Sequence, residues 1–380
     1  MTGPSRNRVR LIGGIALAGA AAIALAVGIG QARHWPAGGA AMAEPTPASE
    51  AKGRSMPNPA VPAPLSSLFD GREWLNTPPL RPEDLRGKVV LVNFWTYSCI
   101  NSLRPLPYLR AWDAKYRAQG LVIIGVHAPE FGFEKKLTNV RQAVAEQGVR
   151  FPVALDSDFT SWRAFGNRGW PGFVFISADG RVRHERLGEG DYAESERLIR
   201  QLLAEAGHAP PTGSIADIPG QGIQAAPDWA SLRSPETYIG YGQAERFDAP
   251  GGVRKDAPAR YAAPADLPLN HWSLAGAWTV GGEYATLNAG GGSIRYRFHA
   301  RDLHLVLGAP AGGDAVRFRV LIDGAAPGTD HGTDVDAEGW GTLREDRLYQ
   351  LVRQSRPVAD RTFEIQFSAP GVRAYVFTFG

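Results

Sequence analysis

The spacing of apolar residues changes along the chain, and this change limits what the chain can fold into. Between residues 65 and 207, short apolar runs of strand length alternate with longer segments of helical spacing. After residue 238, apolar and polar residues instead alternate one by one. The first pattern predicts an α/β sandwich around a mixed sheet. The second predicts antiparallel strands in a β-sandwich of the jelly-roll type, so we expect two folded domains of different class.

The predicted elements follow from this periodicity. In the first domain a proline pair, Pro105 and Pro107, interrupts the first turns of one helix, and Asp179-Gly180 marks a hairpin turn. The strands are expected at 88–94, 121–126, 153–155, 173–176 and 182–186, and the helices at 99–118, 133–147 and 192–206. In the second domain, strands are expected at 294–298, 303–307, 316–320, 363–367 and 372–377.

The amino terminus has the features of an export signal. Three arginines precede residues 11–30, which contain no charged residue and are rich in Ala, Ile, Leu and Val. This pattern predicts a signal peptide or signal anchor within 1–43, with Ala41-Met42-Ala43 as a cleavage motif. The long gap before that motif favours an uncleaved anchor. We therefore expect an extracytoplasmic protein tethered to the cytoplasmic membrane by residues 11–30.

Two segments have the composition of linkers. Residues 44–64 are rich in Pro and Ala, and residues 208–237 are rich in Pro, Gly and Ala without periodicity. They would separate the leader from a first domain at 65–207, and that domain from a second one at 238–380. The net charge of +3 comes from the leader, which has four arginines and no acidic residue. The near-neutral remainder argues against nucleic-acid binding.

The chain contains a single cysteine, Cys99. One cysteine excludes an internal disulfide framework, a cysteine zinc cluster and an iron–sulfur site held by this chain alone. Cys99 lies where the predicted strand 88–94 gives way to a helix. Free backbone N–H groups and the helix dipole at such a position are expected to lower the pKa of the thiol. Trp170-Pro171, just before a later strand, is a candidate cis peptide bond.

These residues carry a resemblance to a known family. The segments 92–99, 125–131, 162–168 and 170–171 are similar to the thioredoxin-like superfamily, specifically its TlpA-type or redoxin members. The exported part as a whole resembles the carboxy-terminal region of DipZ-type proteins, in which a thioredoxin-like domain precedes a carbohydrate-binding-module-like sandwich. The stretches that match in the second half are 237–242, 267–272 and 347–352.

The resemblance implies roles for particular residues. Cys99 matches the cysteine that attacks a substrate disulfide, but the resolving position of the Cys-Ile-Asn-Ser motif is Ser102. A hydroxyl cannot form the second sulfur–sulfur bond, so an external thiol must release the mixed disulfide. Glu130 matches an acid found near the active site in TlpA-type members, where it would serve as proton acceptor for Cys99 if it lies close enough to the thiol. Pro171 is expected to pack against the active-site loop beside a peptide-binding backbone, and Asn93 replaces a buried Asp.

The expected function is that of an exported thiol–disulfide oxidoreductase with one active-site cysteine. Its partners would be extracytoplasmic protein thiols and disulfides, a membrane electron donor of the DsbD or CcdA type, and a glycan. Two alternatives stay open at this point. One is a non-catalytic peptide- and glycan-binding protein on a degenerate thioredoxin fold, and the other is a cytochrome c maturation partner. The haem attachment motif C-x-x-C-H is absent from the sequence.

Two further motifs lie in the second half. The residues Asp334, Asp336, Glu338 and Glu345 approach the spacing of a calcium loop, although a plain acidic turn is the better interpretation. A glycan needs exposed aromatic rings to stack against, and Trp272, Trp278 and Trp340 are the candidates. Tryptophans in a sandwich are more often part of the core.

Overall fold

The central strand of the first domain is β2 (Val89–Trp95), in which every residue is buried. The computed structural model describes residues 63–69, 71–209, 213 and 218–380, so the predicted leader 1–43 and nearly all of the first linker lie outside them. Within the described residues, no helix is long and apolar enough to cross a membrane. The sheet has the order β1-β4-β3-β2-β5-β6, with β2, β3 and β4 parallel and the others antiparallel to their neighbours.

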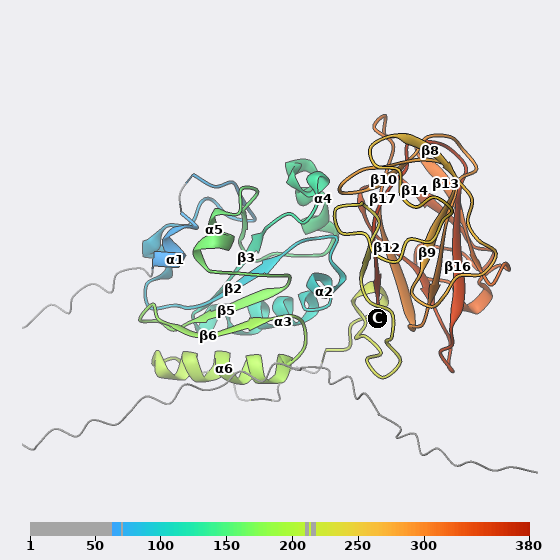
Figure 1. Ribbon diagram of the computed structural model, residues 1–380. Helices are drawn as coiled ribbons and strands as arrows, with labels where there is room; N and C mark the ends of the chain where they lie inside the picture. Colours follow the sequence, from blue (N-terminus) through green and yellow to red (C-terminus); the bar gives the residue numbers. More distant parts are fainter. Residues whose placement is uncertain (1–62, 70, 210–212, 214–217) are drawn as a thin grey trace, which may run out of the picture. The chain divides into compact units, whose positions relative to one another are not determined.

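Helices cover both faces of this sheet (Figure 1). Along β2, Val89 and Leu91 point into a core with α3 and α6, whereas Val90 and Val92 point into a second core with α1. This alternation is what a fully buried strand requires. The other elements are α1 (Ala63–Ser66), β1 (Trp74–Leu75), η1 (Pro82–Leu85), α2 (Ile100–Leu103), α3 (Leu106–Tyr116), η2 (Arg117–Gln119), β3 (Leu121–His127), η3 (Gly132–Lys135), α4 (Leu137–Glu146), β4 (Val153–Leu155), α5 (Thr160–Ala164), β5 (Gly172–Ile176), β6 (Val182–Leu187) and α6 (Tyr192–Glu205).

The expected α/β class is confirmed, with two adjustments to the helices. The helix expected at 99–118 is divided into α2 and α3, and Pro105 is the residue that precedes α3. A proline there has no N–H to donate, which accounts for the break. The helix expected at 133–147 begins instead as the 3-10 helix η3, followed by α4.

The second domain consists of two antiparallel sheets that share one strand, β9 (Trp272–Val280). Its first half pairs with β11 in one sheet, and its second half pairs with β8 and β10 in the other. Gly276, with a φ of +96°, lies at the change of partner and allows the strand to bend. Tyr296 and Phe377 meet between the sheets with their ring centroids 4.9 Å apart. The sandwich expected from the period-two pattern is therefore confirmed.

The strands of the sandwich follow the order β14-β13-β16-β11-β9-β10-β17-β12-β15, with β7 beside β17 and β8 beside β9. Their bounds are β7 (Thr237–Tyr238), β8 (Pro258–Tyr261), β10 (Ala285–Leu287), β11 (Ser293–Phe298), β12 (Asp302–Gly308), β13 (Val316–Ile322), β14 (Trp340–Leu343), β15 (Arg347–Arg353), β16 (Arg361–Phe367) and β17 (Arg373–Phe379), with the 3-10 helices η4 (Gly222–Gln224) and η5 (Gly328–Asp330).

Side chains of the sandwich complete a core of the first domain. The described residues belong to one compact unit, and Leu348 and Tyr375 from the sandwich are part of the same apolar cluster as α3 and α6. The ring of Tyr375 lies 5.1 Å from that of Phe131 and 4.9 Å from that of Phe133. These contacts bring β17, and β7 beside it, against the segment that follows β3.

Candidate active site

Three segments of the first domain meet at one end of its sheet. β2 ends four residues before Cys99, and β3, which runs parallel to it with Trp95 opposite His127, ends three residues before Glu130. β5 runs antiparallel to β2 and begins at that same end, directly after Pro171. Parallel and antiparallel pairing with one central strand thus gathers the expected site residues at a single edge.

Cys99 is the residue that precedes α2, and its exposed fraction is 8%. Its carbonyl oxygen accepts hydrogen bonds from the backbone N–H groups of Ser102 at 3.0 Å and Leu103 at 3.1 Å. Burial, and then the carboxylates of Glu130 and Glu236, raise the pKa of the thiol well above its usual range. The expected lowering by the helix dipole is wrong for this environment, because α2 is only four residues long and desolvation and negative charge outweigh it.

Ser102 is buried in α2 within hydrogen-bonding reach of the thiol. Its hydrogen bonds to Cys99 lower the pKa of the thiol, although less than burial raises it. The Ser102 hydroxyl also accepts a hydrogen bond from the backbone N–H of Thr96 at 3.4 Å. The serine at the resolving position therefore connects the two ends of the active-site loop.

Glu130 is partly buried in the loop after β3. Burial and the carboxylates of Glu134, Glu236 and Glu283 raise its pKa to about 8, against the opposing effect of a hydrogen bond from Tyr238. The charge of Glu130 in turn acts on the pKa of Cys99, so the two groups are close enough to interact. A carboxylate with a pKa near neutrality has the properties of a proton acceptor.

Glu134 organises this loop, and the sequence reasoning missed it. One carboxylate oxygen accepts hydrogen bonds from the Ser98 hydroxyl at 2.7 Å and the Ser98 N–H at 3.2 Å. The other accepts from the N–H groups of Glu130 at 2.5 Å and Phe131 at 3.0 Å. The side chain thus ties the segment before Cys99 to the segment containing Glu130. Its signal in the sequence is an acid three residues after the start of a helical turn, as in a capping box.

The third segment contains Pro171. The Trp170-Pro171 peptide bond is cis, and the Trp170 indole N–H donates to the carbonyl oxygen of Ala128 at 2.9 Å. Asn93 donates to the carbonyl oxygen of Gly172 at 3.2 Å. Within the described part of the chain, the backbone N–H and carbonyl of Trp170 have no hydrogen-bond partner. This backbone is thus available to a bound peptide.

The sandwich contributes acidic and phenolic groups to the same site. The hydroxyl of Tyr238 in β7 donates to a carboxylate oxygen of Glu130 at 2.6 Å. The carboxylate of Glu283 accepts from the N–H of Gly132 at 2.7 Å. The charge of Glu236 raises the pKa of both Cys99 and Glu130. These three residues were also missed, because nothing in their local sequence indicates that they lie beside a residue more than a hundred positions earlier.

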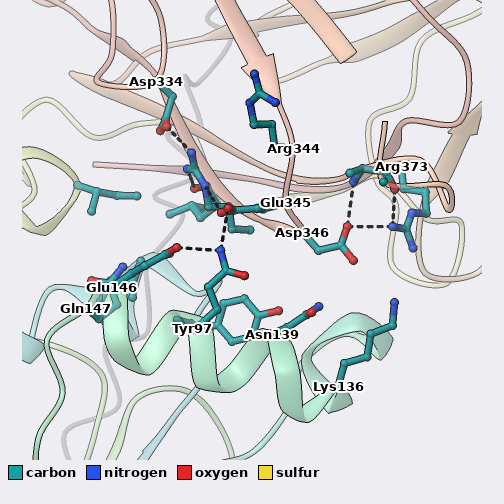
Figure 2. Close-up of a pocket in the computed structure, with 18 of the residues that line it drawn as sticks. Tyr97, Lys136, Asn139, Glu146, Gln147, Asp334, Arg344, Glu345, Asp346 and Arg373 are labelled. Carbon is teal, nitrogen blue, oxygen red and sulfur yellow. Dashed lines mark hydrogen bonds and ion pairs between the residues drawn. The ribbon is translucent and has the colours of Figure 1, made fainter. Parts of the chain in front are cut away.

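A polar cavity of about 690 Å³ lies next to Tyr97, between α4 and the sandwich (Figure 2). The acidic loop expected to be a calcium candidate lies partly on its wall. Arg347 contacts Asp334 at 2.7 Å and Glu345 at 3.6 Å, so two of the four acids are paired with an arginine. In the described ranges, no group of three or more His, Cys, Asp or Glu is placed to hold a metal ion. The calcium interpretation gains no support from this arrangement.

The three tryptophans considered for glycan stacking differ in exposure. Trp272 and Trp278 are fully buried in the sandwich core, whereas Trp340 has an exposed fraction of 38%. Two guanidinium groups lie over the ring of Trp340, that of Arg317 at 4.5 Å and that of Arg319 at 5.3 Å from its centroid. Of the three, Trp340 alone presents a ring at the surface.

Comparison with known proteins matches both domains. Residues 75–199 match the Redoxin family, and residues 234–380 match a family described as Thioredoxin like C-terminal domain. The chain is 37% identical to protein DipZ of Mycobacterium tuberculosis over 312 residues, which are 81% of this chain and 41% of DipZ. It is 27% identical to the thiol-disulfide oxidoreductase YkuV of Bacillus subtilis over 142 residues, 37% of this chain and 95% of YkuV.

Among solved structures, a putative thioredoxin from Neisseria meningitidis is 26% identical, with a TM-score of 0.32, and the match covers 35% of this chain and 88% of that one. The chain spans about two fifths of the length of DipZ.

Proposed function

Since residues 75–199 match the Redoxin family and residues 234–380 match a family described as Thioredoxin like C-terminal domain, we propose that the chain catalyses thiol–disulfide exchange through Cys99 alone. The observation that supports this most directly is the convergence of Cys99, Ser102 and Glu130 at one end of the sheet. Hydrogen bonds from Ser102 and the charge of Glu130 both act on the pKa of the thiol, and Glu130 itself has a pKa of about 8, which suits a proton acceptor.

The proposed reaction needs one sulfur from the protein. The Cys99 thiol gives its proton to the Glu130 carboxylate, and the thiolate attacks one sulfur of a substrate disulfide. A sulfur–sulfur bond to Cys99 forms, the substrate disulfide breaks, and its other sulfur leaves as a thiolate that takes up a proton. Ser102 has no sulfur with which to displace the bound half, so an external thiol attacks the sulfur of that half and forms a disulfide with it. The bond to Cys99 breaks, Cys99 leaves as a thiolate, and it takes back the proton from Glu130.

We also propose where this exchange takes place. The uncharged stretch 11–30 after three arginines supports export to the extracytoplasmic side, with this stretch as the tether. The partners would be protein thiols and disulfides there, and a membrane donor of the DsbD or CcdA type would supply reducing equivalents. The free backbone of Trp170 supports an extended peptide as the form in which a protein substrate binds.

The burial of Cys99 favours a second candidate function. A thiol with an exposed fraction of 8% and a raised pKa is a poor nucleophile. In this alternative the first domain binds extracytoplasmic peptides without chemistry, and the sandwich binds a glycan at Trp340.

Mass spectrometry of the intact folded protein separates the two candidates. The protein is treated with 2-hydroxyethyl disulfide, which is neutral and small, between pH 6 and 9. We expect a single adduct that forms faster as the pH rises and that dithiothreitol removes. Cys99→Ser, which removes the chain's one thiol, should show no adduct. If the native protein stays unmodified while the protein unfolded in urea is modified, the thiol is inaccessible in the folded state. The non-catalytic candidate is then correct.

A further inference from the structure

The hydroxyl of Tyr238 reaches out of the sandwich to the loop that carries Glu130. The backbone of Tyr238 is held in β7, paired opposite Val376 of β17. The hydroxyl of the preceding residue, Thr237, lies 2.9 Å from the hydroxyl of Tyr296 in the sandwich core. The backbone of Tyr238 is therefore held by the second domain, whereas its hydrogen-bond partner, Glu130, belongs to the first.

We propose that Tyr238 is a positioning residue, which holds the Glu130 carboxylate toward the Cys99 thiol so that proton transfer from the thiol depends on the second domain. This inference rests on the proposed function and names a residue of the site that lies outside the thioredoxin-like domain. The step itself is unchanged. Tyr238 forms and breaks no covalent bond, and its hydroxyl donates a hydrogen bond to one oxygen of the carboxylate that is to receive the proton.

The charges around Glu130 explain why the carboxylate needs a donor. Glu134, Glu236 and Glu283 all raise the pKa of Glu130 by repulsion, and Tyr238 opposes them. The strongest influences on Cys99 are its burial, the negative charges of Glu130 and Glu236, and the hydrogen bonds of Ser102. None of these charged groups is a cation. Without its hydrogen bond, Glu130 would either take up a proton or turn away from its acidic neighbours, and in both cases the thiol loses its acceptor.

Tyr238 is also suited to remain a donor. Burial and the neighbouring carboxylates Glu130 and Glu236 raise the pKa of its hydroxyl above the ordinary range. The phenol therefore stays protonated over the whole pH range in which a thiol exchange enzyme is active. Its ring lies 6.5 Å from the ring of Phe131, the residue next to Glu130, so the loop contacts both ends of the side chain.

The experiment measures the rate at which a small neutral reagent, iodoacetamide, alkylates Cys99 in the full folded chain between pH 6 and 10. Tyr238→Phe removes the hydroxyl and keeps the ring. Losing a hydrogen bond to a carboxylate should raise the pKa of Glu130, so the midpoint of the profile should move up by about one pH unit. At pH 7 the rate should fall about tenfold.

The matched control is Tyr284→Phe. Tyr284 also belongs to the sandwich and packs at the same contact, with its ring 5.0 Å from that of Tyr375. Its profile should superimpose on that of the wild type. A third variant, Tyr238→Ala, tests whether Tyr238 positions Glu130 or only shields the Cys99 thiol from the reagent. If Tyr238 only covers the thiol, the Phe and Ala variants react equally well or faster at every pH with an unchanged midpoint, and the inference is overturned.

The same data show whether the inference or the proposed function has failed. A wild-type thiol that stays inert toward both iodoacetamide and 2-hydroxyethyl disulfide in the folded state removes the proposed function, and this inference with it. A reactive wild type whose profile is shared by Tyr238→Phe removes only the role of Tyr238. Thermal unfolding of each variant confirms that the comparison is made between folded proteins.

Discussion

Two regions of the molecule contribute different groups to the surroundings of Cys99. Its own domain supplies Ser102, which hydrogen-bonds to the thiol and lowers its pKa, and the backbone of Trp170 for a substrate. The sandwich supplies Glu236, which raises the pKa of the thiol, and Tyr238, which steadies its proton acceptor. The first region also restrains the thiol, because its own Glu130 raises the pKa of Cys99. The second region adds the charge of Glu236 and holds Glu130, the group that would activate the thiol.

The reactivity of the Cys99 thiol therefore depends on both domains together. A thiol at the start of a helix is ordinarily activated by its own domain. Here the pKa of Cys99 is raised, and two of the carboxylates that affect the site come from residues after position 235. The predictions below test each region by itself, beginning with the group on which both act.

The largest effect is expected from Glu130→Gln. Because the acceptor is lost, the rate of alkylation of Cys99 at pH 8 should fall about 100-fold, within the usual range for removing a general base. The rise in rate near pH 8 should disappear from the profile. The alkylation is quenched at intervals and followed by mass spectrometry, which measures both the rate at pH 8 and the pH profile. Glu185→Gln, an exposed acid on β6, is the matched control and should leave the profile unchanged.

The opposite result is equally informative. The charge of Glu130 raises the pKa of Cys99. If that repulsion were the main influence of Glu130, the Gln variant would react faster than the wild type at every pH. Such a result would place Glu130 with the sandwich as a restraint on the thiol.

The second effect concerns stability, and it follows from the raised pKa of Glu130. Its pKa is 4.5 in ordinary surroundings and about 8 in the folded protein. The folded state therefore binds the proton more tightly, and stability decreases as the pH rises from about 4.5 to 8. Allowing for partial exposure, we expect Glu130 to account for about 2–3 kcal/mol of this loss. Urea unfolding of the wild type and Glu130→Gln at pH 5 and pH 8 should show a smaller loss in the variant.

Much of the region around Cys99 was predictable from local sequence. β2 and β3 are continuous apolar runs, so their ends, and with them Cys99 and Glu130, could be placed at one edge of a sheet. Trp170-Pro171 before β5 was expected to be cis and is cis. These features depend on residues close together in sequence or on the pairing of neighbouring strands.

The environment of the thiol was not predictable in the same way. The dipole argument considers only the helix that begins at Cys99, whereas the pKa of Cys99 depends on how deeply the thiol is buried and on Glu236, far along the chain. The role of Glu134 depends on four hydrogen bonds that exist only once two loops are folded together. β9 was missed although Trp272, Leu274, Trp278 and Val280 recur at every second position, because Gly276 and the alanines on either side of it interrupt the apolar pattern.

The third prediction tests whether the first region lacks anything besides a second sulfur. Ser102→Cys places a thiol one helical turn from Cys99, so the displacement becomes intramolecular and no longer waits for an external thiol. We expect insulin disulfide reduction in the presence of dithiothreitol to rise about tenfold over the wild type. Cys99→Ser combined with Ser102→Cys has one thiol at the wrong position and should remain at background. If Ser102→Cys also stays at background, the site is limited by the burial of Cys99 and by its acidic neighbours, and not by the missing second sulfur.

The smallest effect isolates the charge of the sandwich. Glu236 is near enough to Cys99 for its charge to act on the thiol, so the site should prefer a cationic disulfide, cystamine, over neutral 2-hydroxyethyl disulfide, and disfavour anionic glutathione disulfide. We expect each step in this series to be about threefold in the rate of adduct formation and to shrink at high salt, as a screened interaction does. Glu236→Gln should weaken the preference, whereas Glu245→Gln, an exposed acid of the same domain, should not. Equal rates for the three disulfides in the wild type would show that Glu236 acts on the thiol's proton and has no part in selecting its partner.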